Sequence, residues 1–425
     1  MEDYKFNFQL CKDKEADELM KEYVINICDY LFKHYPKEQL EAIILTGGMT
    51  RGEGSVARHL KIYSDIDLLI VLKNNYYYTR AVKELPILAK RISVELREKE
   101  LCSHVDYGPL LEEHLRGMTA KMFTVELKEH GKVIWGNENV LENIHDLKTK
   151  DIPRDDAINL LFNRMMGQLI FLDDIEKNNQ NELEFAVYHN GKIFVDLAGS
   201  LLAFIGEYET TYQKRAEKFK KIIKREDYSW IRERIPNIAE EVDFWTEFKI
   251  DPDLSKIAHK YGYSTDNLDL NKLGLQIWME LADYVKTLWI WESNQYLKCK
   301  WTEDPIILAK NYFKKESIKS KVMEWINFSK HPHLDKNNFS YKRMIRLLKY
   351  GSPLLLAYIS GAQIYFNTPN IYSNEITPNI ERNLSFAEKF TPVFSGGSAN
   401  IYGKWQILKN DTINTWRTII KGGGE

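Results

Sequence analysis

Two aspartates one residue apart, inside a short apolar stretch, constrain this chain more than any other feature. The stretch is Tyr63-Ser-Asp-Ile-Asp-Leu-Leu-Ile-Val71, and its aliphatic and β-branched residues predict a strand. Side chains alternate between the two faces of a strand, so Asp65 and Asp67 point to the same side. Two carboxylates in this arrangement repel each other unless a cation lies between them or one carries a proton. Because all the ligands are oxygens, a hard divalent ion such as Mg²⁺ suits the pair best.

A glycine-rich segment precedes the acidic strand. It reads Leu45-Thr-Gly-Gly-Met-Thr-Arg-Gly-Glu-Gly54, follows a short apolar strand at 42–46, and predicts a turn. At Gly47 and Gly48 the absence of a Cβ lets backbone N–H groups come close to a phosphate. A helix starting here would add its positive N-terminal end. The order of strand, turn, helix and acidic strand therefore predicts a site for a polyphosphate and a metal ion.

The diglycine and the later Asp-Ile-Asp-Leu at 65–68 resemble the signature of the nucleotidyltransferase superfamily of the DNA polymerase beta type. The resemblance is specific over 43–73 and loose as far as residue 139. Arg51-Gly-Glu-Gly54 and Ser64 are similar to a subset of stand-alone bacterial enzymes, the aminoglycoside-type and minimal antitoxin-type nucleotidyltransferases. The spacer between the glycines and the acids is longer than in the family, and we expect residues 55–61 to extend the intervening helix.

The resemblance implies an enzyme that moves a nucleoside monophosphate from an NTP such as ATP onto an acceptor and releases pyrophosphate. It also implies that Gly47 and Gly48 hold the triphosphate. Asp65 and Asp67 would be catalytic and bind two Mg²⁺ ions, with Mn²⁺ as the alternative. Two metal ions about 4 Å apart can stabilise both the attacking and the leaving oxygen of an in-line displacement.

A third catalytic and metal-binding carboxylate is expected on a later strand, as in relatives. Asp106 fits by its order in the chain, in a short strand at 104–107 that Gly108-Pro109 would close. Glu126, in the alternating segment 122–127, is the alternative. We favour Asp106.

Other polar residues near the turn are candidates for nucleotide or acceptor binding. Many relatives have serine where this chain has Gly48, and Thr50 could compensate for the missing hydroxyl. Ser64 belongs to the matched motif and is assigned to nucleotide binding. Arg51 could donate to a phosphate through both arms of its guanidinium. Glu53 could bind the acceptor, and a salt bridge between Arg51 and Glu53 is the structural alternative.

The helical region offers further candidates. Relatives often bring a lysine from this region onto the triphosphate, and Lys192 is our candidate. Lys192 and Asp196 lie four residues apart and can share a helix face, so an exposed pair is the alternative. Tyr212 and Arg215 are candidates for contacts with the acceptor.

The pattern of the whole chain predicts an α+β fold, with a small mixed-sheet nucleotidyltransferase core and then a large all-helical region. Helical spacing of apolar residues predicts helices at 15–37 and 79–99, on one side of a sheet whose later strands are at 104–107, 122–127 and 131–136. Only helical patterns follow Pro153. We expect a core domain with an N-terminal helix at 1–148, a helical domain closing the nucleotide cleft at 149–297, and a C-terminal helical segment at 298–425.

Composition limits the cellular setting. The net charge of −2 over 425 residues gives no overall attraction to nucleic acid or to an anionic membrane. The N-terminal segment lacks an apolar signal core, and no apolar stretch is long enough to span a bilayer. The four cysteines, at 11, 28, 102 and 299, are far apart and predict reduced thiols. We therefore expect a cytoplasmic protein without a membrane partner.

The acceptor is the least constrained part of the prediction. A small molecule with a hydroxyl or phosphate group is the first expectation. The basic segment 298–349 favours instead an RNA acceptor such as tRNA, as in toxin-like transferases. Its aromatic residues could stack on bases, and they are Trp301, Trp325, Phe339 and Tyr341. A protein acceptor is a variant of the same hypothesis. A solvated lysine-rich face is the alternative for this segment. A third hypothesis is an inactive nucleotide-sensing module, which the intact pair of aspartates disfavours.

Overall fold

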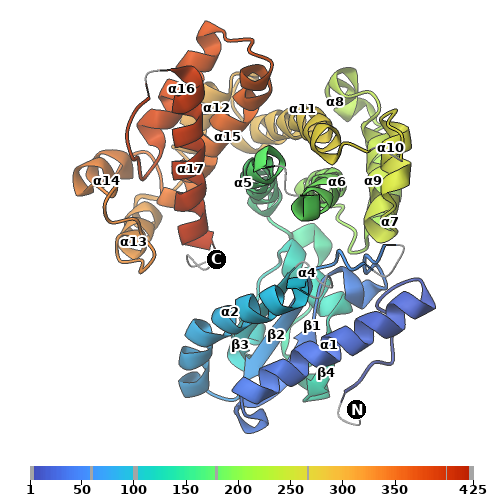
Figure 1. The fold of residues 1–425 in the computed structure, drawn as a ribbon. Helices are drawn as coiled ribbons and strands as arrows, with labels where there is room; N and C mark the ends of the chain where they lie inside the picture. Colours follow the sequence, from blue (N-terminus) through green and yellow to red (C-terminus); the bar gives the residue numbers. More distant parts are fainter. Residues whose placement is uncertain are drawn as a thin grey trace. The chain divides into compact units, whose positions relative to one another are not determined.

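A computed structural model of the chain describes residues 4–57, 61–98, 104–177, 180–265, 268–398 and 400–420 (Figure 1). The described chain is α+β, with one small mixed sheet and a large helical region, as predicted. It divides into two compact units that are discontinuous in sequence. The first unit is Met1–Ala157, Leu201–Arg225 and Ala239–Leu268, and the second is Ile158–Ser200, Glu226–Ile238 and Asp269–Glu425.

The first unit contains the sheet and several helices from later in the chain. Its main elements are α1 (Lys14–His34), β1 (Leu40–Leu45), the 3₁₀ turn η2 (Gly48–Arg51), β2 (Ile66–Leu72), α2 (Asn75–Glu98), β3 (Val105–Leu111), α3 (Glu112–Arg116), α4 (Met122–His130), β4 (Lys132–Gly136), α7 (Tyr212–Ile222), α9 (Ile238–Ile250) and α10 (Leu254–Lys260). The strands lie in the order β3-β2-β1-β4. β2 and β3 are parallel, whereas β1 is antiparallel to both β2 and β4, so the sheet is mixed as predicted.

Both faces of the sheet are covered by helices, which corrects the expectation of helices on one side only. Ile66, Leu68 and Ile70 of β2 share a hydrophobic core with the buried faces of α1 and α2. On the opposite face, Ile44 and Val71 pack with residues of α3, α4 and the turn that follows β4. The alternation of side chains along β2 explains the division, because successive residues reach opposite layers.

The segment 122–127 is not a strand but the start of helix α4. Two orphan N–H groups at its N-terminal end find acceptors, because Lys121 donates to Thr124 Oγ1 at 2.9 Å and Met122 donates to Asp156 Oδ2 at 2.8 Å. Val125 and Leu127 are buried. A short apolar alternation does not distinguish strand from helix, so partners outside the segment decide its structure.

Two further local predictions need correction. β3 does not stop at Gly108-Pro109 but continues to Leu111, because it is an edge strand, where proline is tolerated. The spacer after the diglycine is not an extended helix. The helical part ends at Arg51, and Val56 instead pairs with Ile62 in an antiparallel bridge. Residues 58–60 of this spacer lie outside the described residues.

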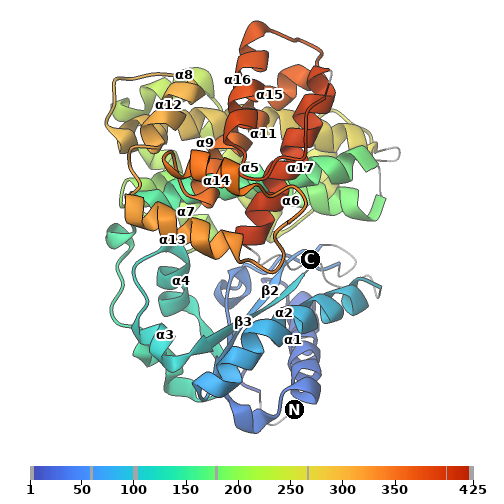
Figure 2. The ribbon, with the colours of Figure 1, turned by 90° about the vertical axis from the view of Figure 1, so that its left-hand side faces the viewer.

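The described residues of the second unit form helices without strands. The main helices are α5 (Arg154–Lys177), α6 (Gln180–Phe204), α8 (Ser229–Arg234), α11 (Leu270–Leu297), α12 (Pro305–Tyr312), α13 (Ile318–Ser329), α14 (Tyr341–Leu348), α15 (Pro353–Tyr372), α16 (Pro378–Phe390) and α17 (Ile401–Ile420). Helices α15, α16 and α17 pack together (Figures 1 and 2). The buried side chains of Trp278, Trp289 and Tyr365 contribute aromatic contacts to the interior of this unit.

The helices and the cysteines bear on the predictions that were made from composition. Within the described part of the chain, no helix combines the length and the apolar character needed to cross a bilayer. Cys11, Cys28 and Cys299 are free thiols, as predicted, and Cys102 lies outside the described residues.

Candidate active site

The diglycine turn lies directly against the acidic strand. Gly47 has φ +80° and ψ −161°, a backbone conformation that is essentially restricted to glycine, and it leads into η2. The N–H group of Thr46 donates to the carbonyl oxygen of Asp67 at 3.0 Å, which joins the end of β1 to β2 at the level of this acid. A Cβ added to Gly47 would lie only 3.2 Å from Asp67 Oδ2. The turn and the second aspartate, predicted separately from the sequence, are therefore neighbours.

The sheet places Asp106 beside the Asp-x-Asp strand. Asp67 and Asp106 are paired positions in the parallel register of β2 and β3. Laterally paired residues of neighbouring strands point to the same face, so the two carboxylates share a face of the sheet. The side chain of Asp106 is 65% exposed, and its Oδ1 lies 3.1 Å from Nε2 of His104. Asp65 immediately precedes β2 and is half-buried.

Glu126, the alternative third carboxylate, lies in a different environment. Its Oε2 accepts a hydrogen bond from Arg51 Nη1 at 2.9 Å, and its Oε1 accepts from Arg215 Nη2 at 2.6 Å and from the hydroxyl of Tyr208. Burial by itself would raise the pKa of Glu126, but the two guanidinium groups and these hydrogen bonds lower it. Glu126 is therefore a carboxylate held ionised between two arginines.

Arg51 and Glu53 connect the glycine-rich loop to helix α7. The side chain of Arg51 is 2% exposed, and its Nε donates to Glu53 Oε2 at 3.0 Å. Glu53 also accepts the N–H groups of Tyr212 and Gln213 at 3.1 and 3.3 Å, so its carboxylate lies at the positive N-terminal end of α7. Burial would lower the pKa of Arg51, yet Glu126, Tyr212 and Glu53 raise it, so the guanidinium stays charged. Arg51 and Glu53 therefore each have charged or hydrogen-bonding partners within the protein itself.

A buried lysine that the sequence did not single out reaches the diglycine. Lys249, near the end of α9, is 3% exposed and donates from Nζ to the carbonyl oxygen of Glu53 at 2.6 Å. A Cβ added to Gly48 would lie 2.8 Å from this Nζ. Its local signal in the sequence is only that a basic residue stands between the apolar residues Phe248 and Ile250.

Three cationic groups lie near the aromatic ring of Tyr212. Its centroid lies 4.3 Å from Lys249 Nζ, 4.8 Å from Arg51 Cζ and 5.1 Å from Arg215 Cζ. The negative face of an aromatic ring attracts such groups, most strongly when they are desolvated. Thus Arg51, Glu53, Tyr212 and Arg215, which the sequence analysis proposed for binding, come together beside the diglycine, with Tyr212 half-buried.

The hydroxyl groups of Thr50 and Ser64, which were predicted to bind the nucleotide, form hydrogen bonds within the glycine-rich loop and its spacer. The hydroxyl of Thr50 donates to the carbonyl oxygen of Gly47 at 2.9 Å, across the 3₁₀ turn. The hydroxyl of Ser64 accepts the N–H group of Ser55 at 2.7 Å, and the hydroxyl of Ser55 in turn donates to the carbonyl oxygen of Lys249. Both predicted residues are buried.

The remaining candidate, Lys192, belongs to the other compact unit. It lies on α6 in the second unit, one turn before Asp196, which accepts a hydrogen bond from Arg164 Nε at 2.5 Å. Its proposed contact with a triphosphate stays a prediction.

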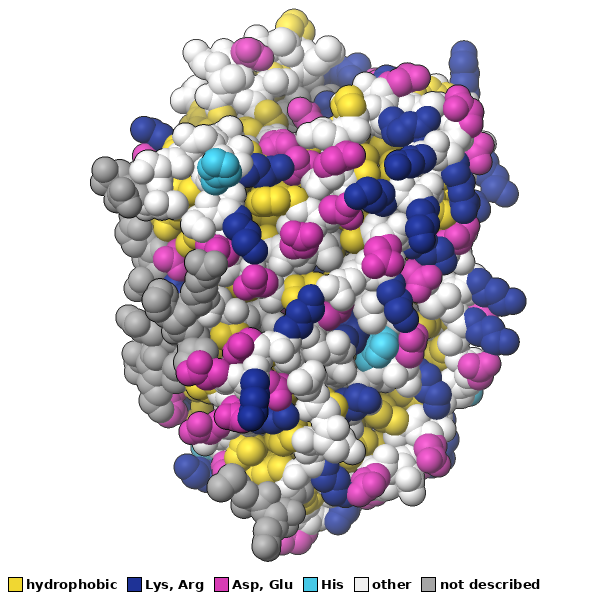
Figure 3. All heavy atoms as spheres, turned by 90° about the vertical axis from the view of Figure 1, so that its right-hand side faces the viewer, with side chains coloured by type: hydrophobic (Ala, Val, Ile, Leu, Met, Phe, Trp, Pro, Cys, Tyr) yellow, Lys and Arg dark blue, Asp and Glu magenta, His cyan; other side chains and the backbone are white. Residues whose placement is uncertain are grey.

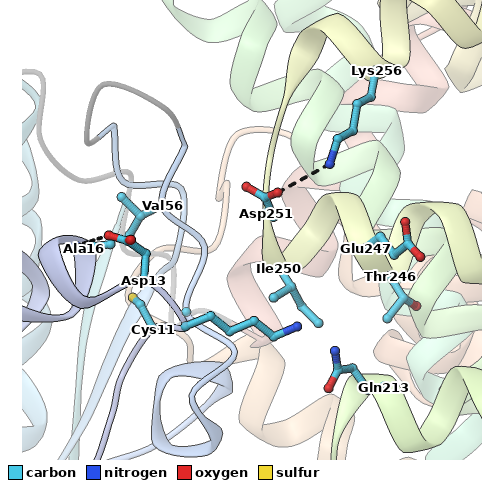
Figure 4. A pocket seen from close by; sticks show the side chains of 12 residues that line it. Cys11, Asp13, Ala16, Val56, Gln213, Thr246, Glu247, Ile250, Asp251 and Lys256 are labelled. Carbon is cyan, nitrogen blue, oxygen red and sulfur yellow. Dashed lines mark hydrogen bonds and ion pairs between the residues drawn. The ribbon is translucent and has the colours of Figure 1, made fainter.

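A cavity of about 660 Å³ adjoins the glycine-rich loop in the first unit (Figure 4). Its lining is Cys11, Lys12, Asp13, Ala16, Gly54, Val56, Gln213, Thr246, Glu247, Ile250, Asp251 and Lys256. Figure 4 shows Asp13 and Val56 on one side and Gln213, Thr246 and Glu247 on the other. Thr246 Oγ1 is buried without a hydrogen-bond partner, so it could serve a bound molecule. The diglycine and the aspartate pair do not line this cavity.

The carboxylates suit a magnesium ion that is shared with a substrate. Among the residues that the structure describes, no group of three or more His, Cys, Asp and Glu side chains is arranged to hold a metal ion. Mg²⁺, however, usually binds to one or two carboxylates together with substrate phosphates and water. Asp67, whose carboxylate lies beside Gly47, and Asp65, two residues earlier, supply oxygen ligands of the kind that this mode uses.

Searches of protein-family models, curated proteins and solved structures find no match for this chain. The class that the fold and the site define is an α+β protein in which a glycine turn, an acidic strand and a buried lysine meet. Its function must therefore be inferred from the chemistry of these groups.

Proposed function

We propose that the protein is a metal-dependent nucleotidyltransferase that moves a nucleoside monophosphate from an NTP to an acceptor and releases pyrophosphate. The observation that supports this most strongly is the distance of 3.2 Å between Asp67 Oδ2 and the position of a Cβ on Gly47. A turn that can bind phosphate through N–H groups and a carboxylate that can bind a cation are useful together for a charged polyphosphate.

In this proposal the loop and α9 hold the triphosphate. The N–H groups at Gly47 and Gly48 approach phosphate oxygens, because no Cβ stands in the way. Lys249 lies over Gly48 and supplies a positive charge there. The buried ion pairs of Arg51 with Glu53 and Glu126 fix the loop so that little reorganisation is needed when the nucleotide binds.

Asp65 and Asp67 would hold Mg²⁺. The ion, when bound, neutralises charge on the phosphates and polarises the α-phosphorus toward attack. Asp106 lies beside Asp67 on the same face, where it could join the metal site or accept the proton of the attacking hydroxyl. Its exposure leaves it accessible to an acceptor.

We propose a small-molecule acceptor with a hydroxyl or phosphate group. The cavity beside the loop has the size of a small-ligand site, which is commonly 300–1,000 Å³. Its lining offers hydrogen-bonding side chains of both charges, such as Lys12 and Glu247, together with the unpaired hydroxyl of Thr246.

The test is incubation with α-labelled NTPs and Mg²⁺, together with either a metabolite pool or total RNA. We expect label on a small molecule, and no transfer when a chelator removes the metal. Asp67→Asn should lower transfer by about a thousandfold or more, because it removes a metal ligand. Asp146→Asn is the matched control, since that side chain is 82% exposed.

Each other outcome has a defined meaning. Label on RNA would replace the small-molecule acceptor by a nucleic acid. Metal-dependent NTP binding without transfer to any acceptor would indicate a nucleotide sensor. Wild-type turnover in a folded Asp67→Asn variant would refute the metal assignment and the proposed function.

A further inference from the structure

One segment of the second unit carries many exposed apolar side chains. Of the fourteen large apolar side chains that are exposed in the described chain, six lie between residues 301 and 345. They are Trp301, Ile307, Ile318, Met323, Tyr341 and Ile345. Ile318 and Ile345 are the most exposed of the six, at 76% and 72%. Clustered exposed apolar side chains generally mark an interaction surface.

The same part of the chain is strongly basic. Eight exposed Lys and Arg side chains lie between 314 and 349: Lys314, Lys315, Lys319, Lys330, Lys336, Lys342, Arg346 and Lys349. Asp335 is the one exposed acid in this segment, all of which the structure describes. Glu316 is partly buried and accepts hydrogen bonds from the N–H and hydroxyl groups of Ser352. The chain's overall charge of −2 therefore conceals a local positive surface.

Helix α14 arranges both properties on its solvent side. Tyr341 and Ile345 are four residues apart and form one exposed stripe. Lys342 and Arg346 form the neighbouring stripe, one residue further along. Arg343 points the other way and donates to the carbonyl oxygen of Thr391 at 2.8 Å, which ties α14 to the rest of the unit. The exposed face thus consists of an apolar strip beside a basic strip.

Helix α13 repeats the arrangement. Ile318 is exposed at its N-terminal end, with the half-buried Val322 and Ile326 in the same stripe. Lys319 and Met323 form the adjacent exposed stripe. The two helices are neighbours (Figures 1 and 2), because Phe339 between them packs against Phe328 of α13 and Tyr341 of α14. We call these exposed stripes of α13 and α14 the basic–apolar face.

Two residues of the segment considered for RNA binding, Trp325 and Lys321, face inward instead. Trp325 is fully buried and donates from Nε1 to the carbonyl oxygen of Gly351 at 2.9 Å. Lys321 is 5% exposed and donates to the carbonyl oxygen of Phe313 at 2.9 Å. Single-stranded RNA needs aromatic platforms among the cations, whereas aliphatic side chains predominate on this face. Tyr341 is the one exposed aromatic side chain in these stripes, so nucleic acid accounts for the charge but not for the exposed aliphatic side chains.

We propose that the basic–apolar face binds the surface of an anionic lipid bilayer. Helices that lie at such a surface combine aliphatic residues, which enter the headgroup boundary, with Lys and Arg, which attract anionic headgroups. Lysine provides seven of the eight exposed cations, and lysine is depleted in protein–protein interfaces, so an acidic protein partner fits less well. By contrast, on the face in Figure 3 Lys and Arg are interspersed with Asp and Glu. Our sequence-based expectation of no membrane partner rested on overall charge and on spanning segments, and neither describes a local face.

The test is flotation of the full chain with lipid vesicles. We expect binding to vesicles in which about one third of the phosphatidylcholine is replaced by phosphatidylserine, and none to pure phosphatidylcholine. Each Lys or Arg near such a surface contributes about 1 kcal/mol, or about fivefold in binding. The double variant Lys342→Glu, Arg346→Glu should therefore bind about thirtyfold or more weakly. Ile318→Glu with Ile345→Glu should also reduce binding, and salt should weaken the wild type.

Matched controls separate this inference from folding and from the proposed catalytic site. Ile87→Glu makes the same change at a 54% exposed position on α2 and should bind vesicles normally. Asp67→Asn should also bind normally, because the inference does not depend on nucleotide transfer. Circular dichroism checks that each variant is folded. Equal vesicle binding by wild type and the folded α13 and α14 variants would overturn the inference. So would binding of a single-stranded RNA oligonucleotide without binding to anionic vesicles.

Discussion

Gly47 is the residue on which the geometry of the candidate site depends most. Its backbone conformation is closed to residues with a Cβ, and the missing side chain leaves room for the carboxylate of Asp67. Gly52, five residues later in the same loop, is also left-handed, with φ +70°, but a Cβ there would meet its nearest neighbour at an ordinary 3.7 Å. Substitution at Gly52 would therefore introduce backbone strain alone, whereas substitution at Gly47 would also introduce a contact with the carboxylate of Asp67.

Replacing Gly47 by alanine should damage both stability and transfer. We expect each of Gly47→Ala and Gly52→Ala to lower the free energy of unfolding by about 1–3 kcal/mol, because both place a side chain in left-handed backbone. Only Gly47→Ala should also reduce NTP binding, since its Cβ displaces Asp67. Urea unfolding and NTP titration measure the two effects. Equal NTP affinity in the two folded variants would contradict this role of the turn.

The two candidate triphosphate-binding lysines, Lys249 and Lys192, can be tested separately. Lys249→Met keeps the length and apolar stem of the side chain but removes the charge beside Gly48. A hydrogen bond to a charged group is worth about 1.5–3 kcal/mol, so NTP affinity should fall by about tenfold or more. Lys192→Met, on α6, removes the charge of the other candidate and is measured in the same way. Isothermal titration with a non-hydrolysable NTP decides between them, and a loss only in Lys192→Met would reverse our assignment.

At the scale of elements, three distant parts of the chain meet at one carboxylate. Glu126 from α4 joins Arg51 from the glycine-rich loop and Arg215 from α7. When one partner of a buried ion pair is removed, the remaining charge is left without compensation. The network therefore holds the loop against α7, and it explains why a helix at 122–130 matters for a turn that ends at residue 51.

Glu126→Gln should destabilise the first unit by about 3–5 kcal/mol, because two buried arginines lose their counter-charge. The pKa of Glu126 is lowered in the folded state from an ordinary value of 4.5. Its stabilisation is therefore present above pH 4.5 and disappears as the pH falls through the lowered value. Denaturant unfolding at several pH values measures this dependence. Glu129→Gln, on the same helix and 51% exposed, should have little effect.

A second buried carboxylate, between α6 and α11, should respond to pH with the opposite sign. Glu292 is fully buried, and its oxygens accept hydrogen bonds from the hydroxyl of Ser200 at 2.9 and 3.0 Å. Burial raises the pKa of Glu292 to about 8, although the Ser200 hydroxyl opposes the shift. The folded protein therefore keeps this proton at pH values where the unfolded chain has lost it.

Stability from protonated Glu292 is complete below pH 4.5 and is lost as the pH rises toward 8. Each pH unit between the two pKa values is worth about 1.4 kcal/mol. Glu292→Gln, which cannot ionise, should match the wild type at pH 4.5 and be several kcal/mol more stable at pH 9. Urea unfolding of the second unit at both pH values checks this. Glu381→Gln, at an exposed position, should show the wild-type pH dependence. A wild type as stable as Glu292→Gln at pH 9 would contradict the prediction.

At the scale of the whole molecule, the chain forms two units that are each assembled from separate segments. Residues 201–225 and 239–268, which the sequence analysis placed in a helical domain, group with the sheet in the first unit. Through this grouping Tyr212, Arg215 and Lys249 come to lie within one unit with the glycine-rich loop. The candidate site therefore draws on residues far apart in the chain.

Much of the fold could be predicted because it follows from local patterns. The strand at 66–72, the long helices at the N-terminus and after β2, and the helical character beyond residue 153 all appear in the structure. Two of the errors are at short segments, 55–61 and 122–127, where few residues give no clear periodicity. There, contacts from elsewhere decide the conformation, as Asp156 does for α4. The other two concern the end of β3 and the second face of the sheet.

The sequence alone determined two local features of the candidate site, the aspartate pair and the diglycine turn, because each depends only on residues that are neighbours in the chain. A one-residue spacing within a strand sets the common face of Asp65 and Asp67, and a diglycine permits the turn that precedes them. Only the tertiary structure decided that Asp106 lies beside Asp67, that Glu126 is occupied by arginines, and that Lys249 reaches a loop 196 residues away. The reason is physical, because strand register and helix packing depend on burial in the complete core rather than on any local pattern.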